Sequence, residues 1–229
     1  MNFDVNNPKK EGRDRLIVSK GHAGPAVYST LSNLGFFDKS CLLTLNEPET
    51  NLPSHCDMNK TPGIDMTTGS LGQGFSCAVG ISLGSKILSD GATIYTIIGD
   101  GESQEGQIWE AAMFAHHQKL DNLIAFLDYN KLQIDGANAE VIGIAPVKEK
   151  FESFGFYVQE IDGHNFDDII SAIESAKLTG KERQKPSIII ANTIKGKGVS
   201  FMENQVGWHG KAPNQDEYEK AIKDIELGG

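Results

Sequence analysis

The sequence predicts an α/β fold in which a doubly wound, mostly parallel sheet carries helices on both faces. Two observations predict it. Short apolar runs rich in β-branched residues alternate with helical segments along the chain, which is the order of strand–helix–strand units in a parallel sheet. The runs before Asp100 and before Asp128 are mostly apolar, as expected for strands that are covered on both faces. Right-handed crossovers should connect the strands.

The first part of the chain shows less regular structure. Residues 1–15 indicate an irregular lead-in that ends in the charged pair Arg13 and Arg15, and a helix is expected at 26–34, before Gly35. Residues 46–68 are rich in Pro, Asn, Thr and Gly and indicate one long loop. A loop of this length inside a compact domain more often serves a function than not.

From residue 69 onward, helices and strands alternate regularly. Small residues after a glycine-rich segment at 69–74 predict a helix that can approach a sheet or another helix closely. The last expected helix has Asp167 and Asp168 in its first turn, where the helix dipole favours acidic residues. No repeat, low-complexity tract or linker interrupts this order, so residues 1–229 are expected to form one domain. The expected strands are 93–98, 123–128, 155–161 and 187–192, and the helices are 75–88, 107–118 and 166–177.

The composition is that of an ordinary soluble enzyme, with 39% hydrophobic and 23% charged residues. A formal net charge of -10 disfavours nonspecific binding to nucleic acid or to an anionic membrane. No stretch approaches the roughly 20 apolar residues of a membrane span, and the N-terminus lacks the features of a secretory signal. Three widely spaced cysteines, Cys41, Cys56 and Cys77, match neither a disulfide framework nor a zinc site. A cytoplasmic protein with reduced thiols is expected.

Two polar residues follow neighbouring expected strands. Asp100 stands between two glycines after one strand, and Asn130 follows the next strand along the chain. Ligands of open α/β sheets bind outside the carboxyl ends of the strands, so both residues should lie at one edge with residues 162–164 and 195–198. Mg²⁺ prefers oxygen ligands, with one or two from the protein and others from phosphate and water. The pair can therefore hold a divalent cation and the diphosphate that it accompanies.

A simpler interpretation competes with this one. Gly-Asp-Gly is a common turn, and Asn130 can cap the loop that follows it. The spacing, the strand–helix–strand context and the segment 130–136 favour the cation site. The glycines and lysines at 195–198 suit a phosphate-binding nest but lack the spacing of a Walker loop, which argues against an NTPase. Whether this loop contacts the diphosphate or only borders it stays open.

The segments around this pair resemble the transketolase family. Asp100 through Asn130 is similar to the thiamine diphosphate fingerprint, and more narrowly the chain resembles the separate N-terminal subunit of split transketolases, the half that binds the diphosphate. The complementary half, which carries the pyrimidine-binding domain, is outside the resemblance. The matching segments occur in family order and cover nearly the whole chain: 14–22, 67–74, 101–106, 130–136 and 207–210.

The resemblance implies a cofactor, thiamine diphosphate, and a cation held with it. Asp100, Asn130 and the carbonyl of Leu132 match the family's metal ligands. Because all three supply oxygen, Mg²⁺, Ca²⁺ and Mn²⁺ all remain candidates. Gly101 matches a glycine that lets the diphosphate approach the backbone closely.

Further positions match residues that contact the cofactor or substrate in the family. Gly69 matches a residue whose carbonyl accepts from the cofactor's 4′-amino group, and Leu71 matches the side chain that wedges the cofactor into a bent shape. His22 and His209 match histidines on the diphosphate and substrate side. Glu105 matches an acid at the subunit interface that is linked to carboxylates of the partner subunit.

Two departures from the family pattern affect the substrate side. His55 should face the donor's hydroxyl and carbonyl, but it stands between Ser54 and Cys56 where the family usually has Gly-His-Pro. A solvated loop histidine is the alternative. His164 recurs in the family and is expected to be structural, not catalytic.

Family members also have a few dozen residues before the region matching 2–15, with a histidine near the substrate. The chain is interpreted as lacking them, as a fragment, a misassigned start or a true reduction.

The resemblance implies a transferase that moves a two-carbon ketol unit from a ketose phosphate to an aldose phosphate, as in the pentose phosphate pathway. It would act only with a C-terminal partner subunit, in an α2β2-type assembly, with His22, His55, Glu105 and His209 as catalytic residues. Two alternatives remain. One is another thiamine diphosphate enzyme, of the 2-oxo acid dehydrogenase or deoxyxylulose phosphate synthase type, although the Ser-Lys-Gly-His and Trp-His-Gly segments favour transketolase. The other is a non-catalytic remnant that serves as a binding scaffold.

Overall fold

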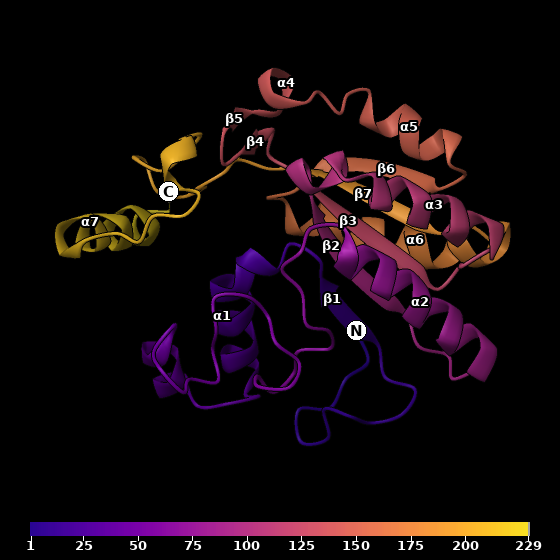
Figure 1. Ribbon diagram of the computed structural model, residues 1–229, viewed down its shortest axis with the longest axis horizontal. Helices are drawn as coiled ribbons and strands as arrows, with labels where there is room; N and C mark the ends of the chain where they lie inside the picture. Colours follow the sequence, from indigo (N-terminus) through magenta and orange to yellow (C-terminus); the bar gives the residue numbers. More distant parts are fainter. Residues whose placement is uncertain (229) are drawn as a thin grey trace.

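A five-stranded parallel sheet lies at the centre of the molecule (Figure 1). The structure is a computed structural model that describes residues 1–228. Every strand pairing in this sheet is parallel, which confirms the α/β class and the mostly parallel sheet expected from the sequence. The strand order is β1 (Arg15–Val18), β2 (Ile94–Gly99), β3 (Leu123–Tyr129), β7 (Ser187–Asn192) and β6 (Tyr157–Asp162).

The central strands are buried because alternate residues pack into cores on the two faces of the sheet. In β3, Leu123, Ala125 and Leu127 lie in one core, and Ile124 lies in the other. Ile189 of β7 joins Ile124 in the second core. Successive side chains of a strand point to opposite faces, so a sheet that is covered on both sides requires runs without polar interruptions.

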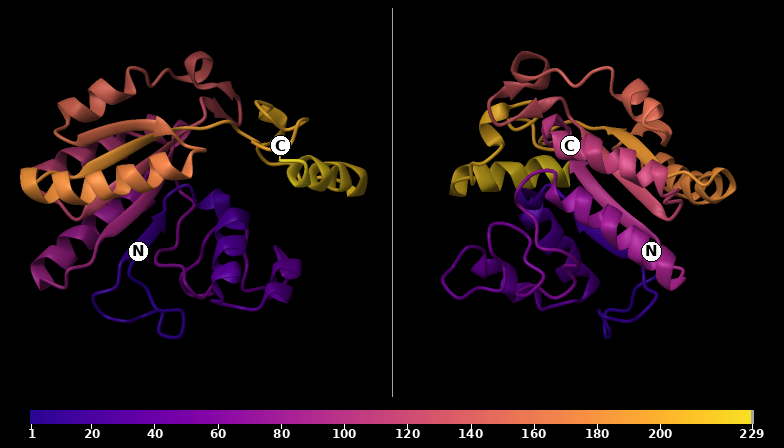
Figure 2. Two further views of the ribbon diagram at one scale, coloured as in Figure 1. Left: turned by 180° about the vertical axis from the view of Figure 1, so that it is seen from behind. Right: turned by 45° about the vertical axis from the view of Figure 1, so that its right-hand side comes forward.

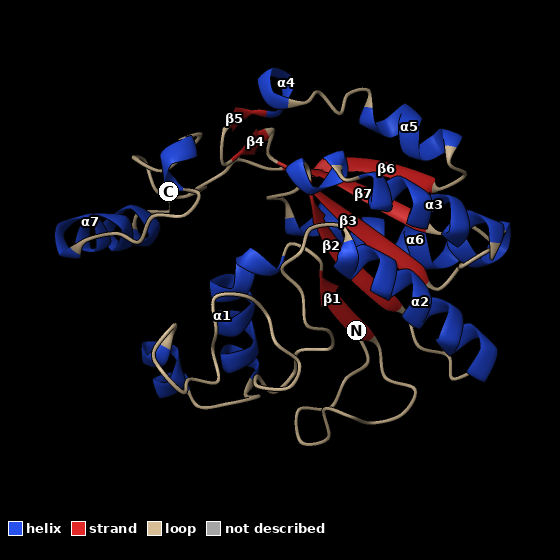
Figure 3. Ribbon diagram, in the orientation of Figure 1, coloured by secondary structure: helices blue, strands red, loops and turns tan. Residues whose placement is uncertain are grey.

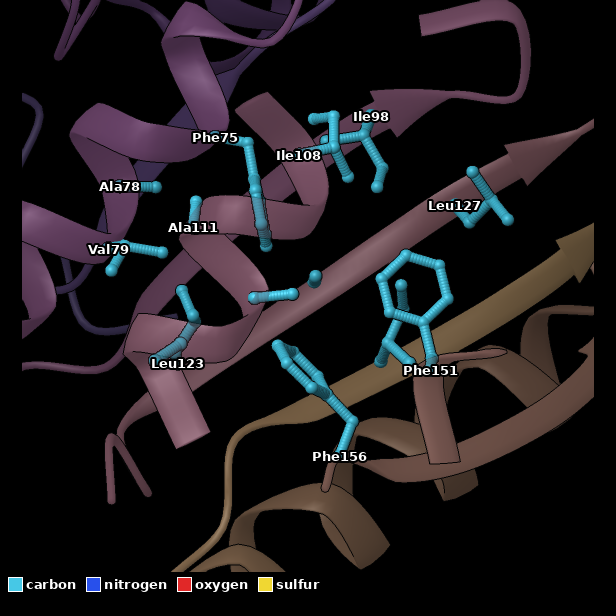
Figure 4. Packing of buried hydrophobic residues seen from close by; sticks show 14 of the residues in the cluster. Phe75, Ala78, Val79, Ile98, Ile108, Ala111, Leu123, Leu127, Phe151 and Phe156 are labelled. Atoms are coloured by element: carbon cyan, nitrogen blue, oxygen red, sulfur yellow. The ribbon is translucent and has the colours of Figure 1, made fainter. Parts of the chain in front are cut away.

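Helices cover both faces of the sheet (Figures 1 and 2). The larger core lies under three helices, and Figure 4 shows Phe75, Ile108 and Phe151 from these helices packed in it. The smaller core lies under α6 (Phe166–Arg183), where Ala172 is buried. The three helices of the larger core are α2 (Gln73–Leu88), α3 (Gly106–His117) and α5 (Val147–Ser153).

The other elements are short or lie apart from the sheet. Residues 46–68 contain no helix or strand, as predicted (Figure 3). Within residues 1–228, no helix is long and apolar enough to cross a membrane. The elements that are short or lie apart from the sheet are η1 (Gly21–Ala23), α1 (Gly24–Leu34), η2 (Lys39–Thr44), η3 (Gly101–Gln104), β4 (Leu132–Gln133), β5 (Gly136–Ala137), α4 (Asn138–Val141), η4 (Val206–Trp208) and α7 (Gln215–Glu226).

The long loop is fastened to the edge of the sheet by one aspartate. Asp65 accepts hydrogen bonds from the guanidinium of Arg13, at 3.1 Å through Nη1, and from the backbone N–H of Leu16 at 2.9 Å. Arg15 Nη1 lies 3.7 Å from the same carboxylate. The charged pair at the end of the lead-in therefore anchors the loop. The lead-in is irregular only as far as Asp14, because Arg15 already pairs with β2.

Most predicted boundaries are close to the observed ones. The strand predicted at 187–192 is observed as β7 with the same bounds. The strand predicted at 155–161 is observed as β6, which begins two residues later, at Tyr157. The predicted end of α6 at residue 177 is wrong, since the helix continues to Arg183. Gln184 ends it there by adopting the left-handed conformation.

Candidate functional site

A cavity of about 750 Å³ opens at the carboxyl ends of β2, β3 and β7. This is the place where open α/β sheets bind ligands, and the volume is typical of sites for small molecules and cofactors. All of the predicted site residues except His55 line it: His22, Gly69, Leu71, Asp100, Gly101, Glu105, Asn130, Leu132 and His209.

Asp100 lies at the floor of the cavity and is only 3% exposed. Its Oδ1 accepts from the backbone N–H of Gly101 at 2.8 Å, and its Oδ2 accepts from the N–H of Lys131. Burial raises the pKa of Asp100, and these two N–H groups partly oppose that effect. The carboxylate therefore links the turn after β2 to the turn after β3, and it keeps lone pairs free for a further ligand.

Asn130 forms the turn that brings β4 over the same floor. Its Oδ1 accepts from the backbone N–H of Leu132 at 3.0 Å, and its Nδ2 lies 3.4 Å from Asp128 Oδ2. Lys131, between Asn130 and Leu132, has a φ of 68°, so the chain turns sharply here. Asn130 and Asp100 are thereby held on neighbouring segments, as the sequence predicts.

The donor set fits a hard divalent cation. Residues 1–228 contain no cluster of three or more His, Cys, Asp or Glu side chains that suits a metal. The oxygen donors predicted for this place are instead one carboxylate, one carboxamide and the backbone carbonyl of Leu132. Such a set is too small for an all-protein cage and suits Mg²⁺, which takes few protein ligands and completes its shell with phosphate oxygens and water.

A partly buried ion pair, which the sequence reasoning missed, lies beside this floor. Lys20 Nζ pairs with Asp128 Oδ2, and the Thr193 hydroxyl donates to Asp128 Oδ1. Burial alone would raise the pKa of Asp128, but the ammonium of Lys20 and these hydrogen bonds hold it below its usual value. Lys20 follows β1, Asp128 is the last residue but one of β3 and Thr193 follows β7, so only the folded sheet brings them together.

Glu102 is a second missed residue, and it organises the cavity wall. It is 2% exposed and accepts from the Ser19 hydroxyl and from the N–H groups of Gly72 and Gly99, the last two at 2.9 Å each. Burial raises its pKa, while the three donors act in the opposite direction. One carboxylate thus joins the ends of β1 and β2 to the start of α2. The glycines around it were the only signal in the sequence.

Two histidines face each other across the mouth of the cavity. The ring centroids of His22 and His209 are 5.2 Å apart, and His209 Nδ1 lies 3.1 Å from Lys195 Nζ. Burial, followed by His209 and Lys20, lowers the pKa of His22 to about 4. Burial and Lys195 likewise lower the pKa of His209. Both rings are therefore neutral near pH 7, where each can donate a hydrogen bond through one ring nitrogen and accept a hydrogen bond or a proton at the other.

His55 lies at the border of the cavity, against Gly69. A Cβ at Gly69 would lie 3.2 Å from the His55 ring, and the φ of Gly69 is 154°, so this position favours glycine. The exposed ring also lies near enough to His22 to contribute to lowering the pKa of that histidine. His116 and His117 are exposed at the end of α3.

His164 stabilises the loop that follows β7. Its Nε2 accepts from the backbone N–H of Ile194 at 2.7 Å, so its proton must be on Nδ1. Within the predicted nest, Lys195 and Gly196 line the cavity, whereas Lys197 points to Glu203 at 3.3 Å. Only the first half of that loop faces the site.

Comparison with known proteins agrees with this geometry. The family model described as "Transketolase, thiamine diphosphate binding domain" matches residues 1–227. A 6-deoxy-6-sulfo-D-fructose transketolase subunit from Clostridium sp. (strain MSTE9) is 54% identical over 229 residues, which cover 100% of this chain and 82% of that protein. A subunit of the apulose-4-phosphate transketolase from Phocaeicola vulgatus is 40% identical over 228 residues, which cover 97% of this chain and 80% of that protein.

Solved structures give the same result. The crystal structure of transketolase from Campylobacter jejuni superimposes with a TM-score of 0.91 at 33% identity, covering 99% of this chain and 36% of that one. Human transketolase is 35% identical over 227 residues, with 35% of its length covered. The chain therefore spans about a third of these longer transketolases and corresponds to their N-terminal part. The resemblance noted in the sequence is confirmed: this chain belongs to the family of transketolase thiamine diphosphate binding domains.

Proposed function

We propose that this chain is a single domain, over residues 1–229, that forms the diphosphate-binding half of a two-subunit transketolase. The observation that carries the proposal is the convergence of Asp100, Asn130 and Leu132 at adjoining strand ends, in one cavity with Lys195 and His209. In this proposal the three oxygens hold Mg²⁺, Ca²⁺ or Mn²⁺, and the cation holds the diphosphate of thiamine diphosphate.

When bound, thiamine diphosphate supplies the nucleophilic carbon and the electron sink for ketol transfer. The residues of this chain bind and orient. Lys195 partly neutralises the diphosphate, Gly101 leaves room for it, and Leu71 and the Gly69 carbonyl hold the cofactor's conformation. The loop of Lys195 thus contacts the diphosphate in this proposal.

Proton transfer falls to the neutral imidazoles at the mouth of the cavity. His22 and His209 have lowered pKa values through burial first and neighbouring positive charge second. Neutral rings can polarise a substrate oxygen or accept its proton near pH 7. His55 would approach the donor's hydroxyl and carbonyl from the long loop. The substrates we propose are a ketose phosphate as donor and an aldose phosphate as acceptor, as in the pentose phosphate pathway.

A sulfonated ketose is a second candidate donor. The relative at 54% identity is a 6-deoxy-6-sulfo-D-fructose transketolase subunit, and the one at 40% identity belongs to an apulose-4-phosphate transketolase. Ketol transfer involves the first carbons of the donor, so the same histidines would serve a donor with either a phosphate or a sulfonate at its far end. Parallel assays with both kinds of ketose distinguish the candidates.

A partner subunit completes the proposed enzyme. It supplies the pyrimidine-binding domain and the glutamate that activates the cofactor, in an α2β2-type assembly. Glu105 is exposed at the start of α3 and lines the cavity, where a partner's carboxylates could be linked to it. The names of the relatives, which are subunits, support this arrangement. Three free cysteines support a reducing, cytoplasmic location.

Calorimetric titration of the chain with thiamine diphosphate, carried out once in Mg²⁺ and once in EDTA, tests the cation ligands. Asp100→Ala and Asn130→Ala are expected to abolish cation-dependent binding. Asp167→Ala, an exposed acid on α6, is the control and should bind like the wild type. Unchanged affinity in both of the first two variants would refute the assignment.

Assays of the chain co-expressed with a C-terminal transketolase half test the reaction. The chain alone should be inactive, and the pair should use ketose donors. Activity only with 2-oxo acids would point to another thiamine diphosphate enzyme. Cofactor binding without any transfer activity in the assembled pair would favour the remnant.

A further inference from the structure

Asn138 is a buried carboxamide next to the proposed cation ligand. Only 4% of the residue is exposed, and within residues 1–228 neither its Nδ2 nor its Oδ1 has a hydrogen-bond partner. Of the side chains described, it is the only one with two such orphaned atoms. Buried polar groups are nearly always paired, so an orphaned one calls for an explanation such as an ion or an ordered water.

The backbone places this side chain beside Asp100. The N–H of Asn138 donates to the carbonyl of Lys131 at 3.0 Å, and the N–H of Lys131 donates to the Asp100 carboxylate. The carboxamide lies near the Asp100 carboxylate, without a hydrogen bond of standard geometry between them. The start of α4 is thus clamped onto the turn that carries the cation ligands.

A capping role does not explain the residue. Asn138 is the first residue of α4, and the N-cap is Ala137. A capping asparagine accepts a hydrogen bond from a backbone N–H of the helix, but the Asn138 side chain accepts none. Its polarity therefore serves neither the helix nor the core around it.

Asp100 has room for one more donor after a cation binds. An ionised carboxylate has about four lone-pair sites, and backbone N–H groups occupy two of them. A cation takes a third. A carboxamide can donate to the fourth and, through its oxygen, accept from a water on the cation.

We propose that Asn138 is a positioning residue of the cation site, whose Nδ2 donates to the Asp100 carboxylate and whose Oδ1 accepts from a water bound to the cation. This inference rests on the proposed function, since it requires that Asp100 holds a cation. Residues that orient metal ligands typically contribute about 10–100-fold to metal affinity. Asn138 should contribute in that range.

The test measures two quantities on the full chain. Mn²⁺ binding in the presence of thiamine diphosphate is followed by electron paramagnetic resonance, and unfolding by urea is followed in EDTA. The matched variants are Asn138→Val and Asn138→Thr. Valine and threonine have the same shape as each other, but only threonine can donate and accept hydrogen bonds. Asn138→Val should weaken Mn²⁺ binding about 10–100-fold and leave the metal-free chain as stable as the wild type or more so. Asn138→Thr should lose less affinity.

Two results overturn the inference. One is Mn²⁺ affinity of Asn138→Val equal to that of the wild type. The other is equal loss of affinity in the Val and Thr variants together with reduced metal-free stability, which means that Asn138 only packs. If Asn138→Val does not fold, Asn138→Ser and Asn138→Ala, which differ by one oxygen, replace the pair; Ser binding Mn²⁺ no tighter than Ala overturns the inference.

The wild type and Asp100→Ala separate this inference from the proposed function. Absence of Mn²⁺ binding by the wild type, or undiminished binding by Asp100→Ala, overturns the cation site and with it the role of Asn138. Binding that is lost in Asp100→Ala but unchanged in Asn138→Val overturns the role of Asn138 alone.

Discussion

Replacing Glu102 by leucine should destabilise the fold, because the change removes the acceptor of two backbone donors from other segments. The N–H groups of Gly72 and Gly99 both donate to this carboxylate at 2.9 Å, and the Ser19 hydroxyl donates to it as well. Leucine is of similar volume and has no acceptor. The substitution therefore isolates the loss of hydrogen bonds from the creation of a cavity.

The size of the effect follows from these contacts. A buried donor that loses its partner costs about 1–3 kcal/mol, so two cost about 2–6 kcal/mol. Burial raises the pKa of Glu102, which shows that desolvation already opposes the charged form. We therefore expect a loss of about 2–4 kcal/mol for Glu102→Leu, at the lower end of that sum. Glu102→Gln keeps one acceptor oxygen and should lose about half as much.

Urea unfolding in EDTA, followed by circular dichroism, measures the free energy of unfolding without any contribution from a cation. Glu105→Leu is the matched control, since Glu105 is exposed in the same loop and should change stability by less than about 0.5 kcal/mol. The slope with urea should stay constant across the variants. A loss below about 1 kcal/mol for Glu102→Leu would refute the dependence of these donors on the carboxylate. A Gln variant as unstable as the Leu variant would refute it too.

Three further predictions concern the cavity. His22 should titrate with a pKa of about 4, as measured by NMR. Because the pKa of the unfolded chain is near 6.5, the contribution of His22 to stability is complete above pH 6.5 and is lost as the pH falls towards 4. A titration midpoint near 6.5 would contradict this prediction. His164→Leu should weaken cofactor binding severalfold by releasing the N–H of Ile194, and His164→Gln, which retains an acceptor, should restore it; equal affinities count against a positioning role. Lys20→Met should raise the pKa of Asp128 and lower stability by about 1–3 kcal/mol, less than for a fully buried pair, since both side chains are partly exposed. Carboxyl-carbon NMR and urea unfolding check this, and an unshifted Asp128 would contradict it.

The central strands were predictable because their signal is local. A strand that is buried on both faces must be apolar at most positions, and β7 is apolar from Ile188 to Ala191, with five of its six residues buried. The short strand β1 lacks such a signal. It begins at Arg15 and is only four residues long, so its identity depends on pairing with β2 and on Asp65 from the distant loop. Sequence windows do not contain that information.

The same distinction applies to the site. Asp100 and Asn130 were predictable because each directly follows a strand, and parallel strands end at one edge. Lys20 and Asp128 also stand at strand ends, but lysine and aspartate are common on surfaces, and only the folded sheet brings them into contact. Glu102 was hidden in the same way, since its donors come from three separate segments.

The charges of the cavity favour the proposed cation. The lining carries five carboxylates against two ammonium groups, Lys20 and Lys195, and its histidines at the mouth have lowered pKa values. Lys20 is already paired with Asp128, so Lys195 is the one ammonium of the lining, within residues 1–228, without a carboxylate partner. A diphosphate that entered this lining alone would meet net negative charge on a chain that is itself acidic. The proposed divalent cation on Asp100 and Asn130 would reverse the sign of the charge at the floor, so the oxygens of the site would become attractive to phosphate only through the ion.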